Sequence, residues 1–356
     1  MIKSNFSGIK ITGIAAAVPD NYVDIKECAE NDILNNDFNV EKYIKNTGVK
    51  GKYLCLQNQT AADLCVAAAE KILTEKNINR NEIGVLIFVT QTPDYKGPST
   101  ACVLQHRLSL STACVAFDIN LGCSGFCYGL NIVSSLLKNS TAKKALLLCG
   151  DISAQNERTR TYKNESLYHL FGDAGSAALI EKTESENDKL CVYSSTDGSG
   201  FKAIVQCAGY SRHPGWNNVG FMDGVEVFNF AISKAPEMLN QYMNDMGTTP
   251  DDYDKLVLHQ ANIYIMKQVA KRTGFSMDKT SVSIDKFANT SSASIPLTIS
   301  EEYGDDNSDK EKRFLTCGFG VGLSWATVEF SVCAKDIFPV IYTNDWFDDG
   351  LINKYL

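Results

Sequence analysis

Residues 144–150 read KALLLCG, and residues 312–318 read KRFLTCG. Each stretch is a short apolar run that ends in glycine, which is typical of a buried β-strand. The two runs share Lys, Leu, Cys and Gly at corresponding places. They predict that a unit in the first half of the chain is repeated in the second half.

Strands alternate with helices around both runs. In the first half, strands are expected at residues 85–89, 116–119, 144–149 and 174–180, and helices at 60–75, 100–108 and 124–137. In the second half, strands are expected at residues 255–258, 282–284, 312–318 and 324–332, and helices at 264–274 and from residue 294 onward. This alternation predicts an α/β architecture.

Spacing supports the repeat. Gln91 lies 32 positions before Cys123, and His259 lies 30 positions before Asn289. The charged stretch at residues 181–189, EKTESENDK, has no apolar face and suggests a boundary between an N-terminal half, residues 1–185, and a C-terminal half, residues 186–356. In such a duplicated fold, the loops after corresponding strands should meet near one pseudo-twofold axis.

The composition is that of an ordinary globular protein. The 356 residues carry 34 Lys and Arg against 42 Asp and Glu, which gives a formal net charge of −8. This balance argues against nucleic acid or an anionic membrane surface as a partner, because both favour a basic face. No apolar run reaches the roughly 18 residues of a membrane span, and the first residues do not resemble a signal peptide. We therefore expect a cytoplasmic protein.

The twelve cysteines are expected to be reduced, and most of them structural, because they lie in apolar runs. No Cys-x-x-Cys pair occurs, and the four histidines form no closely spaced pair. The spacing thus argues against a zinc site, and neither a metal nor another cofactor is expected.

Three polar residues stand at predicted strand-to-helix junctions. Cys123 lies in LGCSGF before a helix, where the helix dipole and free N–H groups favour a thiolate. His259 follows a strand in HQAN, and Asn289 lies in a loop before the next helix. Taken singly, each also has a purely structural explanation. Cys123 could be a small buried residue, His259 a hydrogen-bonded residue without a catalytic role, and Asn289 a turn or cap residue. The repeat places all three at one edge of the fold, where ligands of α/β proteins bind.

The segment CGFGVGLSW, residues 317–325, is rich in glycine. It does not match G-x-G-x-x-G and precedes a strand, so it does not indicate dinucleotide binding. A glycine turn with exposed N–H groups can instead stabilise an oxyanion.

The motifs LGCSGF, FGDAGSAAL, HQAN, ANTSSASIP and GFGVGLSW, in this order, resemble the β-ketoacyl-acyl carrier protein synthase III family of the thiolase superfamily. The resemblance covers roughly residues 8 to 332. It implies a thiolase-like αβαβα layered fold made of two duplicated halves. It also implies a homodimer with the active site near the subunit interface, and acyl-CoA or acyl carrier protein as substrates.

The resemblance also implies roles for individual residues. Cys123 matches the nucleophile that accepts an acyl group, and His259 and Asn289 match the pair that binds the thioester carbonyl of a malonyl donor. The backbone N–H groups of Cys123 and Val321 match the oxyanion hole of the acylation step. Two donors on the developing enolate oxygen fit this chemistry without a metal.

Several positions depart from the family pattern. Lys42 and Asn46 stand where bacterial fatty-acid relatives carry Trp and Arg, and Glu165 stands where a second adenine-clamping Arg is expected. Tyr264 replaces an Arg that commonly follows HQAN. The usual grip on coenzyme A is thus missing, so either coenzyme A binds differently or the acyl group arrives on a carrier protein.

Two further expectations concern the substrates. Lys267, Lys271 and Arg272 lie on the helix after HQAN, either as an ordinary solvated face or as a basic dock for an acidic carrier protein. Gly97 replaces a bulky aromatic residue that caps the acyl pocket in some relatives, so we expect acyl groups longer or bulkier than acetyl.

The leading hypothesis is a ketosynthase that forms a C–C bond by decarboxylative Claisen condensation of a Cys-bound acyl group with a malonyl- or β-ketoacyl-thioester. The TQTPD loop lacks the glutamate base of non-decarboxylating relatives, which favours decarboxylation. The alternative is transfer of the same acyl group to an alcohol or amine. A cysteine protease shares the order Cys, His, Asn but would have a different signature around the cysteine, and a non-catalytic partner subunit would usually have lost the three residues.

Overall fold

The structure is a computed structural model, and it describes residues 1–31, 39–153, 169–206, 211–213 and 220–351. The strands in these ranges form a six-stranded sheet, a five-stranded sheet and two small two-stranded sheets. The six-stranded sheet has the order β15-β2-β8-β7-β5-β6 and the five-stranded sheet has the order β1-β9-β14-β13-β12. The strands of the larger sheet are β2 (Ile9–Val18), β5 (Ile83–Val89), β6 (Val115–Ile119), β7 (Lys144–Asp151), β8 (Ala174–Lys182) and β15 (Ile341–Tyr342). Those of the smaller one are β1 (Ile2–Ser7), β9 (Lys189–Thr196), β12 (Lys255–Leu258), β13 (Glu311–Gly320) and β14 (Ser324–Cys333).

The two sheets repeat one topology. In the larger sheet, β5 pairs with β7 in parallel, whereas the pairs β7–β8 and β8–β2 are antiparallel. In the smaller sheet, β12 pairs with β13 in parallel, whereas the pairs β13–β14 and β14–β9 are antiparallel. The predicted duplication of an α/β unit is therefore confirmed, and KALLLCG and KRFLTCG occupy the corresponding strands β7 and β13.

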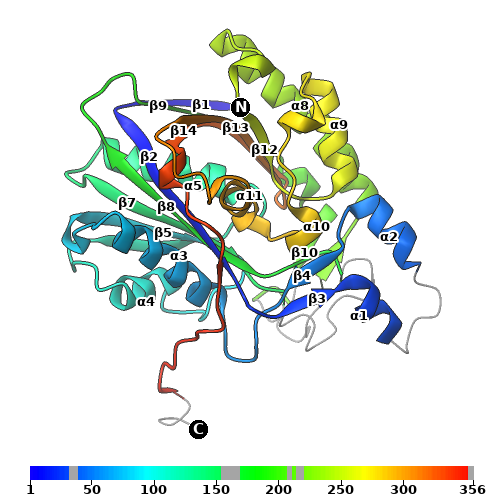
Figure 1. The fold of residues 1–356 in the computed structure, drawn as a ribbon, viewed down its shortest axis with the longest axis horizontal. Coiled ribbons are helices and arrows are strands. Elements are labelled where there is room, and N and C mark those ends of the chain that lie inside the picture. The colour runs from blue at the N-terminus through cyan, green and yellow to red at the C-terminus, as the bar shows by residue number, and fades with distance from the viewer. Residues whose placement is uncertain (32–38, 154–168, 207–210, 214–219, 352–356) are drawn as a thin grey trace.

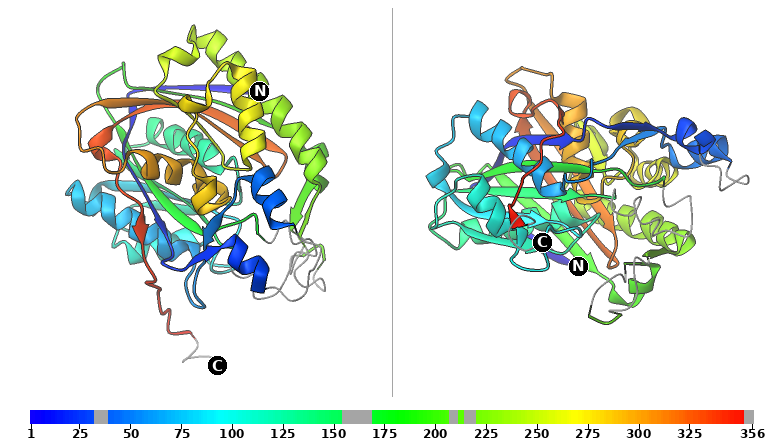
Figure 2. Two further views of the ribbon diagram at one scale, coloured as in Figure 1. Left: turned by 45° about the vertical axis from the view of Figure 1, so that its right-hand side comes forward. Right: turned by 90° about the horizontal axis from the view of Figure 1, so that it is seen from below.

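Helices and sheets alternate in layers (Figures 1 and 2). The helices α5 (Gly125–Lys138) and α11 (Ser294–Tyr303) lie between the sheets and share one buried cluster with β5, β7, β13 and β14. On the outer face of the larger sheet, a second cluster contains α3 (Ala61–Glu75) and α4 (Thr100–Arg107). On the outer face of the smaller sheet, α8 (Gly224–Met246) and α9 (Ile263–Thr273) form a third. This is the αβαβα arrangement.

Local sequence explains the ends of these helices. Thr60 and Asp63 form a reciprocal capping box at the start of α3. Asn262 caps α9 by accepting a hydrogen bond from the backbone N–H of Ile265. The same helix ends at Gly274, which adopts a left-handed φ of 79°. The start of α9 is thus fixed directly after His259.

The strand predicted at residues 282–284 is wrong, because Ile284 begins the short helix α10 (Ile284–Phe287). Only Thr280 bridges to Leu256 of β12 within the part of this segment that the structure describes. The side chain of Gln260 then accepts from the Ser283 N–H at 3.0 Å and donates to the Ser281 carbonyl at 3.3 Å. A buried side chain therefore takes the backbone groups that a longer strand would use.

Each end of the chain joins the sheet of the opposite half. The N-terminal β1 pairs with β9, and the C-terminal β15 pairs with β2. The loop at residues 183–188 connects β8 to β9 and thereby passes from one sheet to the other. The division into residues 1–185 and 186–356 stays a prediction. No helix in the described ranges is long and apolar enough to cross a membrane.

Smaller elements surround one end of the sheets. The helices α1 (Ile25–Asn31) and α2 (Val40–Thr47) lie near the strands β3 (Tyr22–Asp24) and β4 (Gly51–Tyr53). The hairpin of β10 (Ile204–Gln206) and β11 (Gly220–Met222) precedes α8. Residues of this hairpin and of the start of α8 line the cavity described next.

Candidate active site

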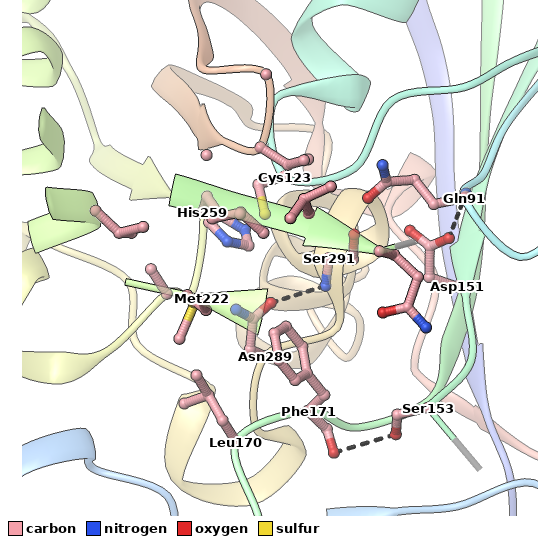
Figure 3. A pocket seen from close by; sticks show the side chains of 18 of the residues that line it. Gln91, Cys123, Asp151, Ser153, Leu170, Phe171, Met222, His259, Asn289 and Ser291 are labelled. Atoms are coloured by element: carbon pink, nitrogen blue, oxygen red, sulfur yellow. Dashed lines mark hydrogen bonds between the residues drawn. The ribbon is translucent and has the colours of Figure 1, made fainter. Parts of the chain in front are cut away.

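A cavity of about 1030 Å³ lies where the two halves meet, and Cys123, His259 and Asn289 all line it (Figure 3). Cys123 comes from the turn between β6 and α5, and His259 directly follows β12. Asn289 comes from the loop between α10 and α11. The structure therefore brings together three residues that the sequence places at separate strand-to-helix junctions.

Cys123 is enclosed by the glycine-rich end of β13 and the turn that follows it. A Cβ added to Gly320 would lie 2.7 Å from the Cys123 Sγ, and one added to Gly318 would lie 2.8 Å from the Cys123 carbonyl oxygen. Side chains at these two positions would collide with the cysteine. The Ser324 hydroxyl donates to the Val321 carbonyl at 2.7 Å and also lies 2.7 Å from the Ser124 hydroxyl, which ties this turn to the start of α5.

The Cys123 thiol is protonated near neutral pH. Burial raises its pKa to about 11, and the charge of Asp151 acts in the same direction. The backbone N–H groups of Val321 and of Cys123 itself lower the pKa, but they do not offset burial. The N–H groups thus act in the direction that the sequence predicts, but burial outweighs them. The same two N–H groups are those expected to form the oxyanion hole.

His259 is a neutral base held in a fixed orientation. Burial lowers its pKa to about 3, so it carries no charge near neutral pH. Its Nδ1 lies 2.8 Å from the Ser294 hydroxyl oxygen, and its ring packs edge-to-face on Phe319 at 5.8 Å between ring centroids. With Nδ1 engaged by Ser294, Nε2 is the ring nitrogen left for a ligand.

Asn289 presents an amide donor to the cavity. Its Oδ1 accepts the backbone N–H of Ser291 at 2.9 Å, which assigns the oxygen, and the Nδ2 group has no hydrogen-bond partner among the described residues (Figure 3). Its backbone bridges to Phe171, with its N–H on the Leu170 carbonyl at 3.0 Å. Ala288 and Ser291 on either side have left-handed φ values of 57° and 51°. The hydrogen bonds of the loop hold this strained geometry in place and fix the orientation of the Asn289 amide.

A buried carboxylate, Asp151, also lines the cavity and had no sequence-based prediction. Asp151 accepts the backbone N–H of Gln91 at 2.6 Å, the Thr90 hydroxyl at 3.2 Å and the Ser292 hydroxyl at 3.4 Å. Burial raises its pKa. It ties the end of β7 to the loop after β5 and to the Asn289 loop. Its only sequence signal is its place directly after the strand KALLLCG.

Other predicted positions lie outside the cavity wall. Lys42 and Asn46 lie on α2 and do not line the described cavity, and Glu165 falls outside the described residues. Gly97 follows the lining residue Lys96, is exposed, and has no atom within 4 Å of an added Cβ. Tyr264 is 53% exposed and stacks on Phe228, a lining residue, at 5.6 Å between ring centroids.

The predicted basic face is only partly free. Lys267, Lys271 and Arg272 are all exposed on α9. However, Arg272 donates from Nη1 to the Ile232 carbonyl of α8 at 2.6 Å. Lys267 and Lys271 therefore form the more accessible part of this face.

Two repeated sheets that bring a cysteine, a histidine and an asparagine to one cavity define the class of thiolase-fold condensing enzymes. Comparisons with known proteins identify the family. Family models described as 3-oxoacyl-[acyl-carrier-protein (ACP)] synthase III and as its C-terminal part match residues 117–198 and 243–331. The chain belongs to this 3-oxoacyl-ACP synthase III family of the thiolase superfamily, and it is a condensing acyltransferase.

Individual relatives cover between 79% and 97% of the chain. A β-ketoacyl-[acyl-carrier-protein] synthase III of Caldanaerobacter subterraneus is 34% identical over 79% of this chain and 86% of its own length. A putative 3-oxoacyl-[acyl-carrier-protein] synthase 3 of Campylobacter jejuni is 32% identical over 97% and 100%. The crystal structure of a 3-oxoacyl-(acyl-carrier protein) synthase from Burkholderia xenovorans superimposes with a TM-score of 0.88 at 33% identity, covering 96% of this chain and 99% of that one. The predicted family and fold are confirmed.

Proposed function

We propose that the protein condenses a Cys123-bound acyl group with a malonyl- or β-ketoacyl-thioester, with loss of the donor's carboxylate as CO₂ when the donor is malonyl. The observation that carries this proposal is the shared cavity, where a thiol faces a neutral imidazole and an amide whose donor group is free. The reaction would serve fatty-acid or secondary-metabolite biosynthesis.

Acylation comes first. The Cys123 sulfur attacks the carbonyl carbon of an acyl thioester, and the C–S bond to the donor breaks. Because the thiol is protonated near neutral pH, it loses its proton as it attacks, and the proton passes through Nε2 of His259 to the departing thiolate. The N–H groups of Cys123 and Val321 hold the oxyanion of the tetrahedral intermediate.

Condensation follows on the acyl-enzyme. A malonyl thioester carbonyl accepts hydrogen bonds from His259 and from the Asn289 amide, and the C–C bond to its carboxylate breaks to give CO₂ and an enolate. The enolate carbon attacks the Cys123 thioester, forming the new C–C bond. The cysteine leaves as a thiolate and takes up a proton, which restores the free enzyme.

Acyl-CoA, an acyl carrier protein, or both deliver the substrates in this proposal. The family positions for gripping coenzyme A are occupied by Lys42 and Asn46, which lie on α2 away from the cavity wall. Lys267 and Lys271, with Arg272 beside them, offer cations to an acidic carrier. The aromatic pair Phe228 and Tyr264 lies at the same side of the cavity.

We also propose a homodimer that forms through the β6 edge. β6 is the outermost strand of the larger sheet, and Val115 on it is 53% exposed. An exposed strand edge of this kind invites pairing with a second copy. Pairing there would place the neighbouring subunit beside Gly97, where the open space fits an acyl chain longer than acetyl. A cytoplasmic location stays a prediction that fits the free cysteines in the described ranges.

Release of CO₂ tests the reaction type. Purified protein would receive an acyl-CoA together with malonyl-CoA or a malonyl carrier protein labelled in the free carboxylate. Labelled CO₂ and a β-ketoacyl product are expected, and both should be lost in Cys123→Ala. Acylation without CO₂ release from any malonyl donor would instead favour transfer of the acyl group to an alcohol or amine.

A further inference from the structure

The chain continues well beyond the last strand of the duplicated core. After β14 it forms β15 against β2, and residues 343–350 then continue without regular structure toward the bottom of Figure 1 (red). We call residues 343–351 the C-terminal strap. The matched family models end at residue 331, so the strap lies outside them.

Buried polar groups of the core are used to hold the strap. The Gln59 amide, which is 3% exposed, donates from Nε2 to the carbonyls of Thr343 at 2.9 Å and Asp345 at 3.0 Å. Both N–H groups of that amide thus donate hydrogen bonds to the strap. Without it, a buried donor pair would lose its partners, which is costly.

A second anchor joins the strap to two helices. Asp63, the capping residue of α3, accepts the Phe347 N–H at 3.2 Å on the same Oδ1 that lies 2.7 Å from Arg107 of α4. The Arg107 and Asp63 side chains are 10% and 3% exposed. The Phe347 ring lies 4.6 Å from the Arg107 guanidinium and shields this ion pair.

The end of the strap reaches the wall of the cavity. Residues 91–96 line the cavity together with Cys123, and we call them the pocket loop. The Tyr95 hydroxyl in this loop donates to Asp349 Oδ2 of the strap at 2.7 Å. Burial raises the pKa of the adjacent Asp94, and the charges of Asp63 and Arg107 raise and lower it, respectively. The strap therefore supports the pocket loop from outside, next to the exposed Gly97.

We propose that the C-terminal strap, through the Tyr95–Asp349 hydrogen bond, fixes the pocket loop and so helps determine which acyl groups fit beside Cys123. This rests on the proposed acylation of Cys123. The contact is 254 residues apart in sequence and joins two exposed side chains, so its role is positional rather than catalytic. Releasing it lets the pocket loop move away from the cavity and weakens discrimination by chain length.

The test compares Tyr95→Phe, Asp349→Asn, the double variant and a chain that ends at Asp345. Acylation of Cys123 by acetyl-, butyryl-, octanoyl- and decanoyl-CoA would be followed by intact mass. In each variant the ratio of the fastest to the slowest donor should fall about three- to tenfold, the effect expected for one lost hydrogen bond. The double variant should change no more than either single one, because both remove the same contact.

Asp345→Asn is the matched control. It removes the same charge from the same strap, and its carboxylate has no hydrogen-bond partner within the part of the chain that the structure describes. This variant should keep the wild-type ratio. If the point variants keep it as well, the strap does not set the specificity and the inference is overturned.

Alkylation of Cys123 separates this inference from the proposed function. Iodoacetamide and its N-octyl derivative probe the space beside the thiol without acyl transfer, and peptide mass mapping reports the modified cysteine. Tyr95→Phe and Asp349→Asn should raise the rate with the octyl reagent relative to iodoacetamide. A wild type that takes no acyl group overturns the proposed function. An unchanged ratio of the two alkylation rates in the variants overturns the inference about the strap.

Discussion

The Ser294 hydroxyl oxygen lies 2.8 Å from Nδ1 of His259 and donates its own proton to the Ser291 carbonyl at 2.8 Å. In this arrangement Nδ1 carries the ring proton and Nε2 accepts, as acylation requires. If the hydroxyl turns to donate to Nδ1, Nε2 carries the proton and can donate to an enolate oxygen, as condensation requires. One serine thus supports both neutral tautomers, so the imidazole can enter each of the proposed steps uncharged.

Ser294→Ala should slow condensation more than acylation. Without the hydroxyl, Nδ1 loses the donor that supports the tautomer with a proton on Nε2, whereas the Ser291 backbone still offers the ring a hydrogen bond. We expect CO₂ release from the acyl-enzyme to fall about tenfold, the effect expected for one lost hydrogen bond. Ser300→Ala makes the same change elsewhere on α11 and should leave both steps intact. Equal slowing of both steps by Ser294→Ala would contradict the tautomer account.

The depressed pKa of His259 predicts loss of stability in acid. The unfolded histidine takes up a proton below about pH 6.5, whereas the folded one stays neutral down to about pH 3. The unfolded state therefore binds more protons in this window, and stability falls as the pH falls through it. At pH 5 the cost is about 2 kcal/mol relative to pH 8. Denaturant unfolding of the protein and of His259→Gln should show a shallower acid decline in the variant, and identical declines would contradict the buried neutral state.

Gly320→Ala should block acylation. Its Cβ would lie 2.7 Å from the Cys123 sulfur, so either the turn or the nucleophile must move. A displacement of about 1 Å at the reacting atoms costs roughly 100-fold in rate. Gly198→Ala is the control, because an added Cβ there meets no atom within 4 Å. Single-turnover acylation measured by intact mass distinguishes the two, and normal acylation in Gly320→Ala would refute the close packing described.

Charge reversal on α9 tests the delivery of substrate. Lys267→Glu and Lys271→Glu should each raise KM for a carrier-protein substrate about three- to tenfold, with KM for the matching acyl-CoA unchanged. Lys189→Glu reverses an exposed charge at the start of β9 and serves as the control. Equal effects of the two α9 variants on both substrates would show that this face does not recognise the carrier.

Much of the fold and the catalytic trio could be predicted because both depend on local patterns. Strands such as KALLLCG are recognisable from apolar runs, and the junctions that hold Cys123 and His259 follow from strand order, whereas Asn289 lies between two helices. The false strand at residues 282–284 arose because Gln260, distant in sequence, takes its hydrogen bonds.

Other features depend on the surroundings of single side chains. Asp151 has no motif of its own and becomes significant through partners from two other segments of the chain. The elevated pKa of Cys123 comes from burial, which outweighs the helix start that the sequence shows. The strap has no periodicity, and its contacts with Gln59 and Tyr95 appear only in the folded chain.

The most direct test of the central claim is intact mass in two steps, first with an acyl-CoA and then with malonyl-CoA or a malonyl carrier protein. The wild type should gain one acyl group and lose it when the malonyl donor is added. Cys123→Ala should gain nothing, and Asn289→Ala should gain the group but lose it about 100- to 1,000-fold more slowly, as expected for one missing oxyanion donor. Acyl gain in Cys123→Ala, or loss from Asn289→Ala at the wild-type rate, would contradict the account.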